Sequence, residues 1–339
     1  MTITAEELYQ NLRHIKVSTS TCRFTKEKCE ELAPLVNKIN HLKVEKNAVI
    51  LAHSYVNPEI HHTVADFVGD SYELSKNAKE CDADLIIFSA VKFMGETAKI
   101  INPQKEVRLP NKLNGCSLAD SISYKQLEQI KADHPDYTFV CYINTSAETK
   151  ALCDVCVTSS NVYNIIEKIP NDKIYFLPDA LMGKNIVNEL RRRGSKKEIK
   201  YYHGTCYVHE TYEPEMIDYL RLEYPKVQVV AHPECKPEIL EKSDFVGSTS
   251  QMIQHVKDSD KDQFFLLTEC GLSARLQLET KNKHFLGTCT MCKYMKDNSL
   301  QNILRVLESP DPDDIIHLDP TIQEKALHCI QQMFYYNDK

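Results

Sequence analysis

One pattern occurs three times along this chain of 339 residues. Each copy begins with an apolar run typical of a strand (NAVILAH, YTFVCYI, VQVVAH), and a turn of small polar residues follows (VGDS, VTSS, VGST). When the copies are aligned on these turns, Ser71, Ser160 and Thr249 lie 89 residues apart. A period of this kind indicates tandem structural units, and it constrains the fold more than any other feature.

Each unit continues in the same order after its polar turn. A helical pattern leads to a second apolar run (DLIIFS, KIYFLP, QFFLLT) and to a glycine, and Gly95, Gly183 and Gly271 lie 88 residues apart. Each unit then ends in a cysteine-containing segment (NGC, HGTC, LGTC). Strands that alternate with helices predict parallel sheets with helices on both faces. We therefore expect an α/β protein in which three repeated three-layer α/β/α domains surround a central cavity.

The repeats also predict the domain boundaries. We expect a helical segment over residues 1–35, α/β units over residues 36–116, 117–206 and 207–292, and a second helical segment over residues 293–339. The helical segments contain EKCEELAPLVNKINHLK, SLQNILRVLE and IQEKALHCIQQMF, and we expect them to pack on the outside. Neither segment contains a Pro/Gly-rich linker, so the units should pack tightly.

Charge and hydropathy exclude some classes of partner. The net charge of −7 argues against nucleic-acid binding, and no apolar run approaches the roughly 18 residues that span a membrane. The first residues show no apolar signal core, so we expect a cytoplasmic protein. In that compartment the 13 cysteines are expected to be reduced thiols or metal ligands rather than a disulfide framework.

The polar turns at residues 69–71, 158–160 and 247–249 each precede a helix. Their hydroxyl groups can simply cap these helices. Helix N-termini also bind anions, and three such turns directed at one centre favour a small, multiply charged anion such as a dicarboxylate or a phosphate ester.

The cysteines that end the units suggest a metal site. They are Cys116, Cys206 and the pair Cys289 and Cys292. One thiolate from each unit would give three ligands to zinc or to an iron–sulfur cluster, and would leave one coordination position open for catalysis. Cys153 and Cys156 also have C-x-x-C spacing, but no second pair completes a site, so we expect them to be small buried residues.

A series of motifs carries a resemblance to a known family. In chain order they are HSYVNPEI, ADFVGDS, KFMGETAKIINP, GCSLADS, YINTSAETKAL, CVTSSN, CYVHE, AHPEC, DFVGSTSQM and CKYMK. The chain resembles quinolinate synthase over nearly its whole length. That resemblance implies Rossmann-like α/β domains around a 4Fe–4S cluster with three cysteine ligands and one open iron site.

The same resemblance implies the reaction and its partners. The reaction is a transferase-type condensation of iminoaspartate (iminosuccinate) with dihydroxyacetone phosphate in de novo NAD synthesis, and its products are quinolinate, phosphate and water. The partners implied are these small molecules, with no nucleic acid and no membrane. Whether the enzyme that supplies iminoaspartate also binds the chain stays open.

Carried over by motif, the cluster ligands are Cys116 of GCSLADS, Cys206 of CYVHE and Cys292 of CKYMK. The third assignment has an alternative, because alignment of the internal repeats favours Cys289. The family context C-x-x-M-K favours Cys292, which we adopt. Cys289 would then be a second thiol able to form a redox-sensitive pair with Cys292.

The substrate-binding positions implied are His53, Ser71, Tyr142, Ile143, Asn144, Ser159, His232, Pro233, Glu234 and Thr249. Tyr55, His209 and Glu234 match positions suited to proton transfer. Glu234 would act as a general acid or base if burial raises its pKa toward neutrality. His61 and His62 fall on a helix-like stretch, and we expect them at the surface.

Two other classes of protein remain as alternatives. Enzymes of diphthamide synthesis and of isoprenoid diphosphate reduction also combine three α/β repeats with one cysteine per domain, and they use their cluster for electron or radical chemistry. The HPEC, YIN and TSS blocks weigh against them. The second alternative is a non-catalytic metal-binding or iron-sensing protein, which would not need Glu234, Tyr55 or the three polar turns.

Overall fold

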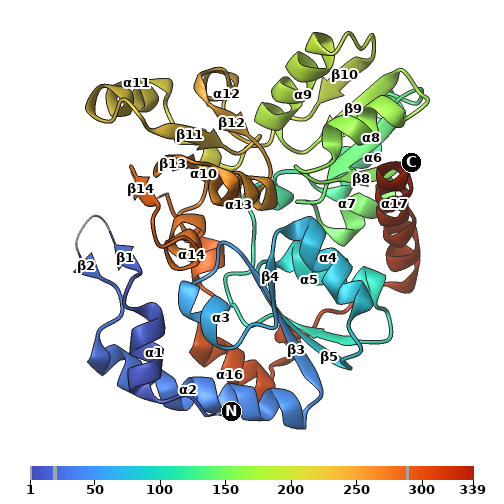
Figure 1. The fold of residues 1–339 in the computed structure, drawn as a ribbon. Coiled ribbons are helices and arrows are strands. Elements are labelled where there is room, and N and C mark those ends of the chain that lie inside the picture. Colours follow the sequence, from blue (N-terminus) through green and yellow to red (C-terminus); the bar gives the residue numbers. More distant parts are fainter. Residues whose placement is uncertain (1, 18–20, 288–289) are drawn as a thin grey trace.

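The computed structural model describes residues 2–17, 21–287 and 290–339 (Figure 1). In these ranges the chain forms three parallel sheets of four strands each and one short antiparallel pair. The three sheets and their helices surround a common centre. The α/β class and the three repeated units predicted from the sequence are confirmed.

The first sheet has the strand order β4-β3-β5-β6. Its strands are β3 (Ala48–His53), β4 (Phe67–Gly69), β5 (Leu85–Ser89) and β6 (Glu106–Arg108). Its helices are α3 (Pro58–Thr63), α4 (Ser71–Glu80) and α5 (Lys92–Ile101), and the short turn η1 (Ala119–Ser121) follows. β3 and β5 are buried along almost their whole length, as strands between two helical layers must be.

The second sheet has the order β10-β9-β7-β8. Its strands are β7 (Thr138–Tyr142), β8 (Val155–Val157), β9 (Lys173–Leu177) and β10 (Glu198–Tyr201). The associated helices are α6 (Tyr124–Asp133), α7 (Ala147–Leu152), α8 (Val162–Lys168) and α9 (Ala180–Arg192).

The third sheet has the order β12-β11-β13-β14. Its strands are β11 (Gln228–Ala231), β12 (Phe245–Val246), β13 (Gln263–Leu267) and β14 (His284–Leu286). The associated helices are α10 (Tyr207–Glu210), α11 (Pro214–Glu223), α12 (Pro237–Lys242), α13 (Thr249–Asp258), α14 (Gly271–Glu279) and α15 (Lys293–Lys296).

All three sheets place their strands in the same order, with the second strand of the unit at one edge, then the first, third and fourth. The first and third strands are the two apolar runs found in the sequence. The second and fourth strands have only two to four residues, too few for a periodic pattern. Gly183 shows why the repeated glycine is needed, because a Cβ there would lie 2.6 Å from the Tyr201 side chain on β10.

The two terminal segments are mainly helical. They form α1 (Ala5–Leu12), the pair β1 (Lys16–Val17) and β2 (Thr21–Cys22), α2 (Lys26–Glu45), α16 (Leu300–Glu308), the turn η2 (Pro312–Asp314) and α17 (Pro320–Asp338). α1, α2 and α16 pack together beside the first sheet, whereas α17 packs on α7 and β8 of the second unit (Figure 1). α2 runs through residue 35, where the sequence had suggested a boundary. None of the helices described is long and apolar enough to cross a membrane.

A group of four cysteines lies in the core of the second unit. Cys141 of β7 and Cys329 of α17 bring their sulfur atoms to 3.6 Å, and Cys153 and Cys156 also contact Cys141. All four are free thiols that are almost fully buried. The C-x-x-C pair therefore packs as small apolar residues between β7, β8 and α17, as expected.

The ends of the first strands bring the site together. β3 ends at His53, β7 ends at Tyr142, and β11 is followed directly by His232. Parallel strands of α/β sheets present their carboxyl ends to ligands. Because the three sheets repeat one topology around one centre, these three side chains reach a shared cavity.

Candidate active site

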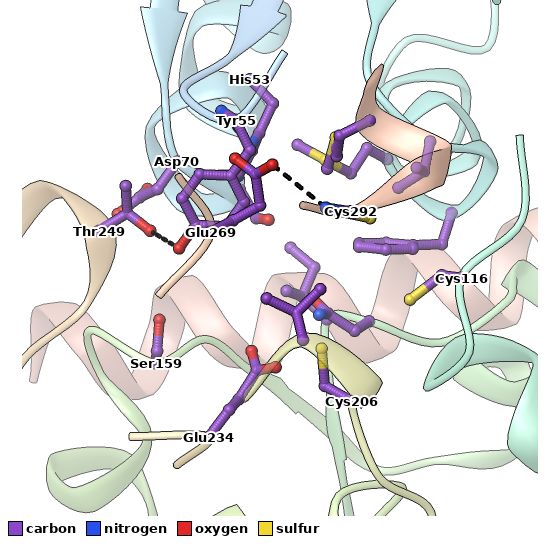
Figure 2. Close-up of a pocket in the computed structure, with 18 of the residues that line it drawn as sticks. His53, Tyr55, Asp70, Cys116, Ser159, Cys206, Glu234, Thr249, Glu269 and Cys292 are labelled. Atoms are coloured by element: carbon purple, nitrogen blue, oxygen red, sulfur yellow. Dashed lines mark hydrogen bonds between the residues drawn. The ribbon is translucent and has the colours of Figure 1, made fainter. Parts of the chain in front are cut away.

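The central cavity collects residues from all three units (Figure 2). The predicted site residues that line it are His53, Tyr55, Ser71, Cys116, Tyr142, Ile143, Asn144, Ser159, Cys206, His209, His232, Glu234, Thr249 and Cys292. Pro233 lines a neighbouring pocket instead, and its carbonyl accepts a hydrogen bond from Asn185 Nδ2 at 2.8 Å. The unpredicted residues that face the cavity include Asp70 and Glu269.

Three free thiols lie along one side of this cavity, one from each unit or its end. Cys206 and Cys292 immediately precede a short helix, and Cys116 lies three residues before the turn η1 (Ala119–Ser121). Cys206 is the N-cap of α10 and Cys292 the N-cap of α15, while the carbonyl of Cys116 accepts the N–H of Asp120 in η1. The three thiols thus have the same local setting, although they come from distant parts of the chain.

This setting aims backbone N–H groups at the sulfur atoms. The sulfur of Cys116 accepts the backbone N–H groups of Leu118 and Ala119. The sulfur of Cys206 accepts that of His209, and the sulfur of Cys292 accepts those of Tyr294 and Met295. Such contacts stabilise a thiolate. Burial has the larger, opposite effect and raises the pKa of all three thiols, that of Cys116 to about 12. A positively charged metal would supply the charge that the ionised thiols need.

Only one of the two candidates for the third ligand, Cys292, lies among the described residues. Cys289 lies outside the described residues. Cys292 is half-buried, lines the cavity, and donates its backbone N–H to Glu269 Oε1 at 3.1 Å. The assignment of Cys292 as third ligand stays a prediction, for which its position in the cavity is favourable.

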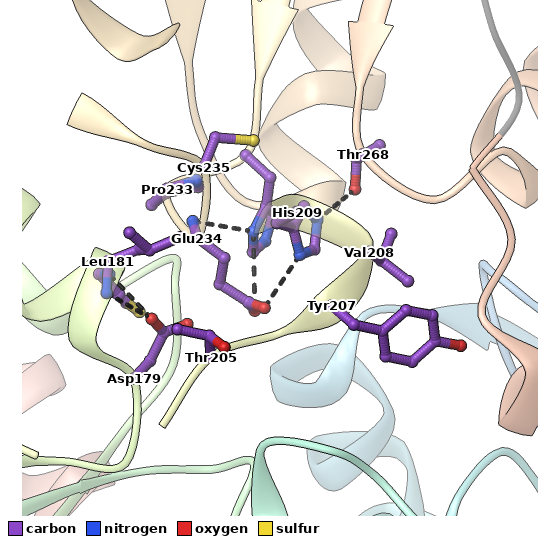
Figure 3. A network of polar contacts seen from close by, with 12 residues as sticks. Asp179, Leu181, Thr205, Tyr207, Val208, His209, Pro233, Glu234, Cys235 and Thr268 are labelled. Atoms are coloured by element: carbon purple, nitrogen blue, oxygen red, sulfur yellow. Dashed lines mark hydrogen bonds and ion pairs between the residues drawn. The ribbon is translucent and has the colours of Figure 1, made fainter. Parts of the chain in front are cut away.

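Glu234 lies at the centre of a polar network in the cavity (Figure 3). Tyr142 donates its hydroxyl to Glu234 Oε1 at 2.7 Å, and His209 Nδ1 lies 3.0 Å from Oε2. Burial alone would raise the pKa of Glu234, but the charge and hydrogen bond of His209, together with His232 and Tyr142, lower it to about 2. The condition set from the sequence, a pKa raised by burial, is therefore not met, because the imidazole of His209 faces this carboxylate.

A chain of hydrogen bonds links Glu234 to Tyr55 through Thr268, which the sequence did not reveal. His209 Nε2 lies 3.0 Å from Thr268 Oγ1, which in turn lies 2.6 Å from Tyr55 Oη. Tyr55 Oη also lies 2.8 Å from Thr249 Oγ1. Burial raises the pKa of Tyr55 well above its usual value, so the phenol keeps its proton. The carboxylate and the phenol thus share one connected network across the cavity.

His53 is held as a neutral ring. It is 5% exposed, and its Nδ1 accepts the backbone N–H of Tyr55 at 3.2 Å. Burial lowers the pKa of His53 to about 4 and, for the same reason, that of His232 to about 3. The expectation that His61 lies at the surface is wrong, because it is buried with its Nε2 2.8 Å from the His53 carbonyl.

These buried rings predict a dependence of stability on pH. Since the pKa of His53 is lower in the folded chain than the usual value near 6.5, the unfolded state binds more protons as pH falls below 6.5. The free energy of unfolding should then fall, by up to about 1.4 kcal/mol per pH unit for each such histidine. Urea unfolding of cluster-free protein between pH 6.5 and 5 should show a shallower fall for His53→Asn. The exposed His41→Asn is the control, and an unchanged slope in His53→Asn would contradict the assignment.

In the polar turns, the residues that cap the helices differ from those that line the cavity. Asp70 caps α4 by accepting the N–H groups of Tyr72 and Glu73, and Ser248 caps α13 by accepting that of Gln251. The next residues, Ser71 and Thr249, line the cavity and are not the caps.

The second unit differs from the other two. α8 has no side-chain cap, and Ser159 lies just before it at the cavity. The hydroxyl groups of Ser71, Ser159 and Thr249 are therefore not helix caps, and those of Ser159 and Thr249 contact Tyr142 and Tyr55. Asp70 also contacts Ser248 Oγ and the N–H of Ser250, both at 3.4 Å, and so joins units one and three.

Comparison with known proteins shows the same family over most of the chain. The profile of the family described as "Quinolinate synthetase A protein" matches residues 37–335. A quinolinate synthase of Alkaliphilus metalliredigens is 40% identical over 301 residues, which cover 88% of this chain and 97% of that protein. That of Aquifex aeolicus is 40% identical over 311 residues (90% and 94%), and that of Sinorhizobium fredii is 38% identical over 301 residues (89% and 82%). With a profile match that spans all three units and relatives aligned over most of their own length, the chain belongs to the quinolinate synthase family.

Proposed function

We propose that this chain condenses iminoaspartate with dihydroxyacetone phosphate to give quinolinate, phosphate and water, and that Cys116, Cys206 and Cys292 hold a 4Fe–4S cluster. The observation that carries the proposal is the convergence of three matching thiols beside a carboxylate–phenol network in one cavity. The relatives named above are quinolinate synthases, and family membership supports the same activity here.

The residues present fit such a cluster. The three thiols are free, face one cavity and receive N–H groups from the turns that they begin. Thiolates favour iron–sulfur clusters, and hydrogen bonds to sulfur tune such centres. With three protein ligands, the cluster would supply an open iron that acts as a Lewis acid on a substrate oxygen.

The side chains opposite the thiols would bind the charged ends of the substrates. Ser71, Ser159 and Thr249 present hydroxyl groups from the three units, and the neutral ring of His53 adds a hydrogen-bonding group. Tyr142 and His232 occupy positions equivalent to His53, so the three walls are chemically different. This difference suits an asymmetric substrate pair in a cavity with pseudo-threefold symmetry.

The remaining side chains would move protons. The triose phosphate must lose phosphate, isomerise, close on the imine nitrogen and lose water, and each step needs a proton to be added or removed. Glu234 is ionised and paired with His209, so this pair rather than the carboxylate alone would accept a proton, while Tyr55 retains its proton and would donate one. Thr268 connects His209 to Tyr55 and can pass a proton between them.

The experiment that tests this proposal is anaerobic analysis of iron and sulfide together with a quinolinate assay on the same sample. Turnover with iminoaspartate and dihydroxyacetone phosphate, in the absence of an electron donor, would separate this function from the reductive and radical enzymes. A sample with a full cluster and no quinolinate would contradict the proposal.

A second candidate is a site for a single metal ion. Ligand atoms of Cys206, His209 and Glu234 all lie within 4.8 Å of one another. These three could hold one zinc ion without any cluster. The same metal analysis decides, because a zinc site contains no sulfide.

The hydroxyl groups give a prediction of their own. Ser71→Ala and Ser159→Ala should each raise KM for one substrate by about tenfold to a hundredfold, since each removes a hydrogen bond to a charged group. The cluster spectrum should not change. Ser75→Ala is the matched control, because the Ser75 hydroxyl is buried on the same helix as Ser71 but donates to the Ser71 carbonyl at 2.6 Å. Normal KM values in both variants would mean that these hydroxyls bind no substrate.

The proposal includes the setting of the enzyme. We propose the cytoplasm as its compartment, because a cluster needs reduced thiols. The division into residues 1–35, 36–116, 117–206, 207–292 and 293–339 stays a prediction, and its first boundary falls inside α2. The enzyme that supplies iminoaspartate is the protein partner to test, by co-purification under anaerobic conditions.

A further inference from the structure

Glu269 is a buried carboxylate in the cavity that no sequence motif singled out. It lies two residues beyond the end of β13 and is 1% exposed. Its Oε1 accepts the backbone N–H of Cys292 at 3.1 Å (Figure 2), and its Oε2 accepts that of Gly271 at 2.6 Å. A single side chain thus joins the third sheet to the residue that carries the third thiol.

The charge of Glu269 is balanced by Lys296, one helical turn beyond Cys292. Lys296 Nζ lies 3.0 Å from Glu269 Oε1 and 3.2 Å from Oε2. The same ammonium donates to the backbone carbonyl of Tyr55 at 2.5 Å. Only 15% of the Lys296 side chain is exposed, so solvent screens this pair much less than a surface ion pair.

The segment around Cys292 lies outside the three four-stranded sheets and is held in place by contacts from other units. Asn57 of unit one donates to the carbonyls of Lys296 at 3.1 Å and Asn298 at 2.5 Å. Asn298 in turn donates to the Ala90 carbonyl at 3.0 Å. Unit three contacts this segment through the Glu269 carboxylate and through a backbone hydrogen bond, in which the Cys270 N–H donates to the Thr290 carbonyl at 3.0 Å.

We propose that Glu269, together with Lys296, is a positioning residue that fixes the Cys292 thiol at the cavity by anchoring its segment to units one and three. This inference rests on the proposed function, since it concerns the third ligand of the cluster. Removal of the carboxylate would leave the Cys292 N–H without its acceptor and the Lys296 ammonium without its counter-charge. Buried charges that lose their partner are strongly unfavourable, so the segment would shift.

If Glu269 had a purely structural role, replacing it would lower stability and leave the reactivity of the Cys292 thiol unchanged. Glu269 also accepts the N–H of Gly271 at the start of α14, and loss of that contact would lower stability without changing any thiol. Asp314 offers a matched control, because it is a 2% exposed carboxylate paired with Arg305 and Lys112 on the outer side of unit one. Asp314→Asn should lower stability but leave the cavity thiols as they are.

The test compares wild type, Glu269→Ala, Glu269→Gln, Lys296→Met and Asp314→Asn. Cluster-free proteins are treated with iodoacetamide, and the rates of alkylation of Cys292 and Cys116 are followed by peptide mass spectrometry. We expect the Cys292:Cys116 rate ratio to rise about tenfold in Glu269→Ala and Lys296→Met. A segment that has lost a hydrogen bond to a charged group is held less firmly, so its thiol is more accessible. Glu269→Gln, which keeps an acceptor for the N–H, should change the ratio less, and Asp314→Asn not at all.

The same variants are then reconstituted anaerobically with iron and sulfide. Glu269→Ala and Lys296→Met should retain less iron per chain than wild type, or show an altered electron paramagnetic resonance spectrum after reduction. An unchanged thiol ratio and a normal cluster in Lys296→Met and whichever Glu269 variant folds would overturn the inference. If wild type itself takes up no cluster, the proposed function fails, while the alkylation ratio still decides whether Glu269 positions Cys292.

Discussion

Replacement of any one of Cys116, Cys206 and Cys292 by serine is expected to abolish quinolinate formation and the brown colour of the reconstituted protein. A hydroxyl is a poor replacement for a thiolate toward iron, and each thiol supplies one of only three protein ligands. The structure adds a reason for equal effects, because all three cysteines begin the same kind of helical turn and receive N–H groups from it. The measurement is iron and sulfide content, absorption and turnover on one anaerobic sample.

The controls test which cysteine is the third ligand. Cys153→Ser alters a buried thiol of the four-cysteine core group, and it should keep colour and turnover. Cys289→Ser should do the same if Cys292 is the ligand. If Cys292→Ser keeps colour and turnover while Cys289→Ser loses both, the third ligand is Cys289, as the internal repeat suggested.

The predictable part of the fold was the part set by local pattern. The apolar runs around Ile50, Val140 and Val230 became the first strands of the sheets, because four to six residues of buried strand leave a clear hydrophobic signal. β12, with two residues, leaves no such signal and depends on pairing with β11. The repeat then showed which strand ends share a centre.

The site was less predictable where partners lie far apart in the sequence. Glu269 contacts Cys292, and Thr268 contacts both His209 and Tyr55, yet nothing in the order of the chain links these residues. Such pairs form only when the chain has folded, and only the pair of Thr268 and Tyr55 joins two units. The pKa of Glu234 depends on a contact of this kind too, because burial would raise it and the facing imidazole of His209 lowers it.

Glu234→Gln should lower kcat by about a hundredfold to ten-thousandfold, the usual contribution of a general acid–base group. The amide keeps the shape and still accepts the hydrogen bond from Tyr142, but it cannot take up a proton at neutral pH. Cluster content and substrate binding should persist. Glu210→Gln is the matched control, because Glu210 is an exposed carboxylate next to His209 whose partner is the Thr205 hydroxyl.

Tyr55→Phe should lower kcat by a similar factor for a different reason. It removes the proton donor, and it breaks the hydrogen bonds that link Thr268 to Thr249. Tyr137→Phe, whose hydroxyl contacts Glu198 in unit two, is the control for the loss of a phenol. Single-turnover kinetics at saturating substrate separate chemistry from binding. Near-normal chemistry with weakened binding in Glu234→Gln would make this residue a substrate clamp, whereas slow chemistry in both variants, with a full cluster, would establish the network from Glu234 to Tyr55 as the route of the protons.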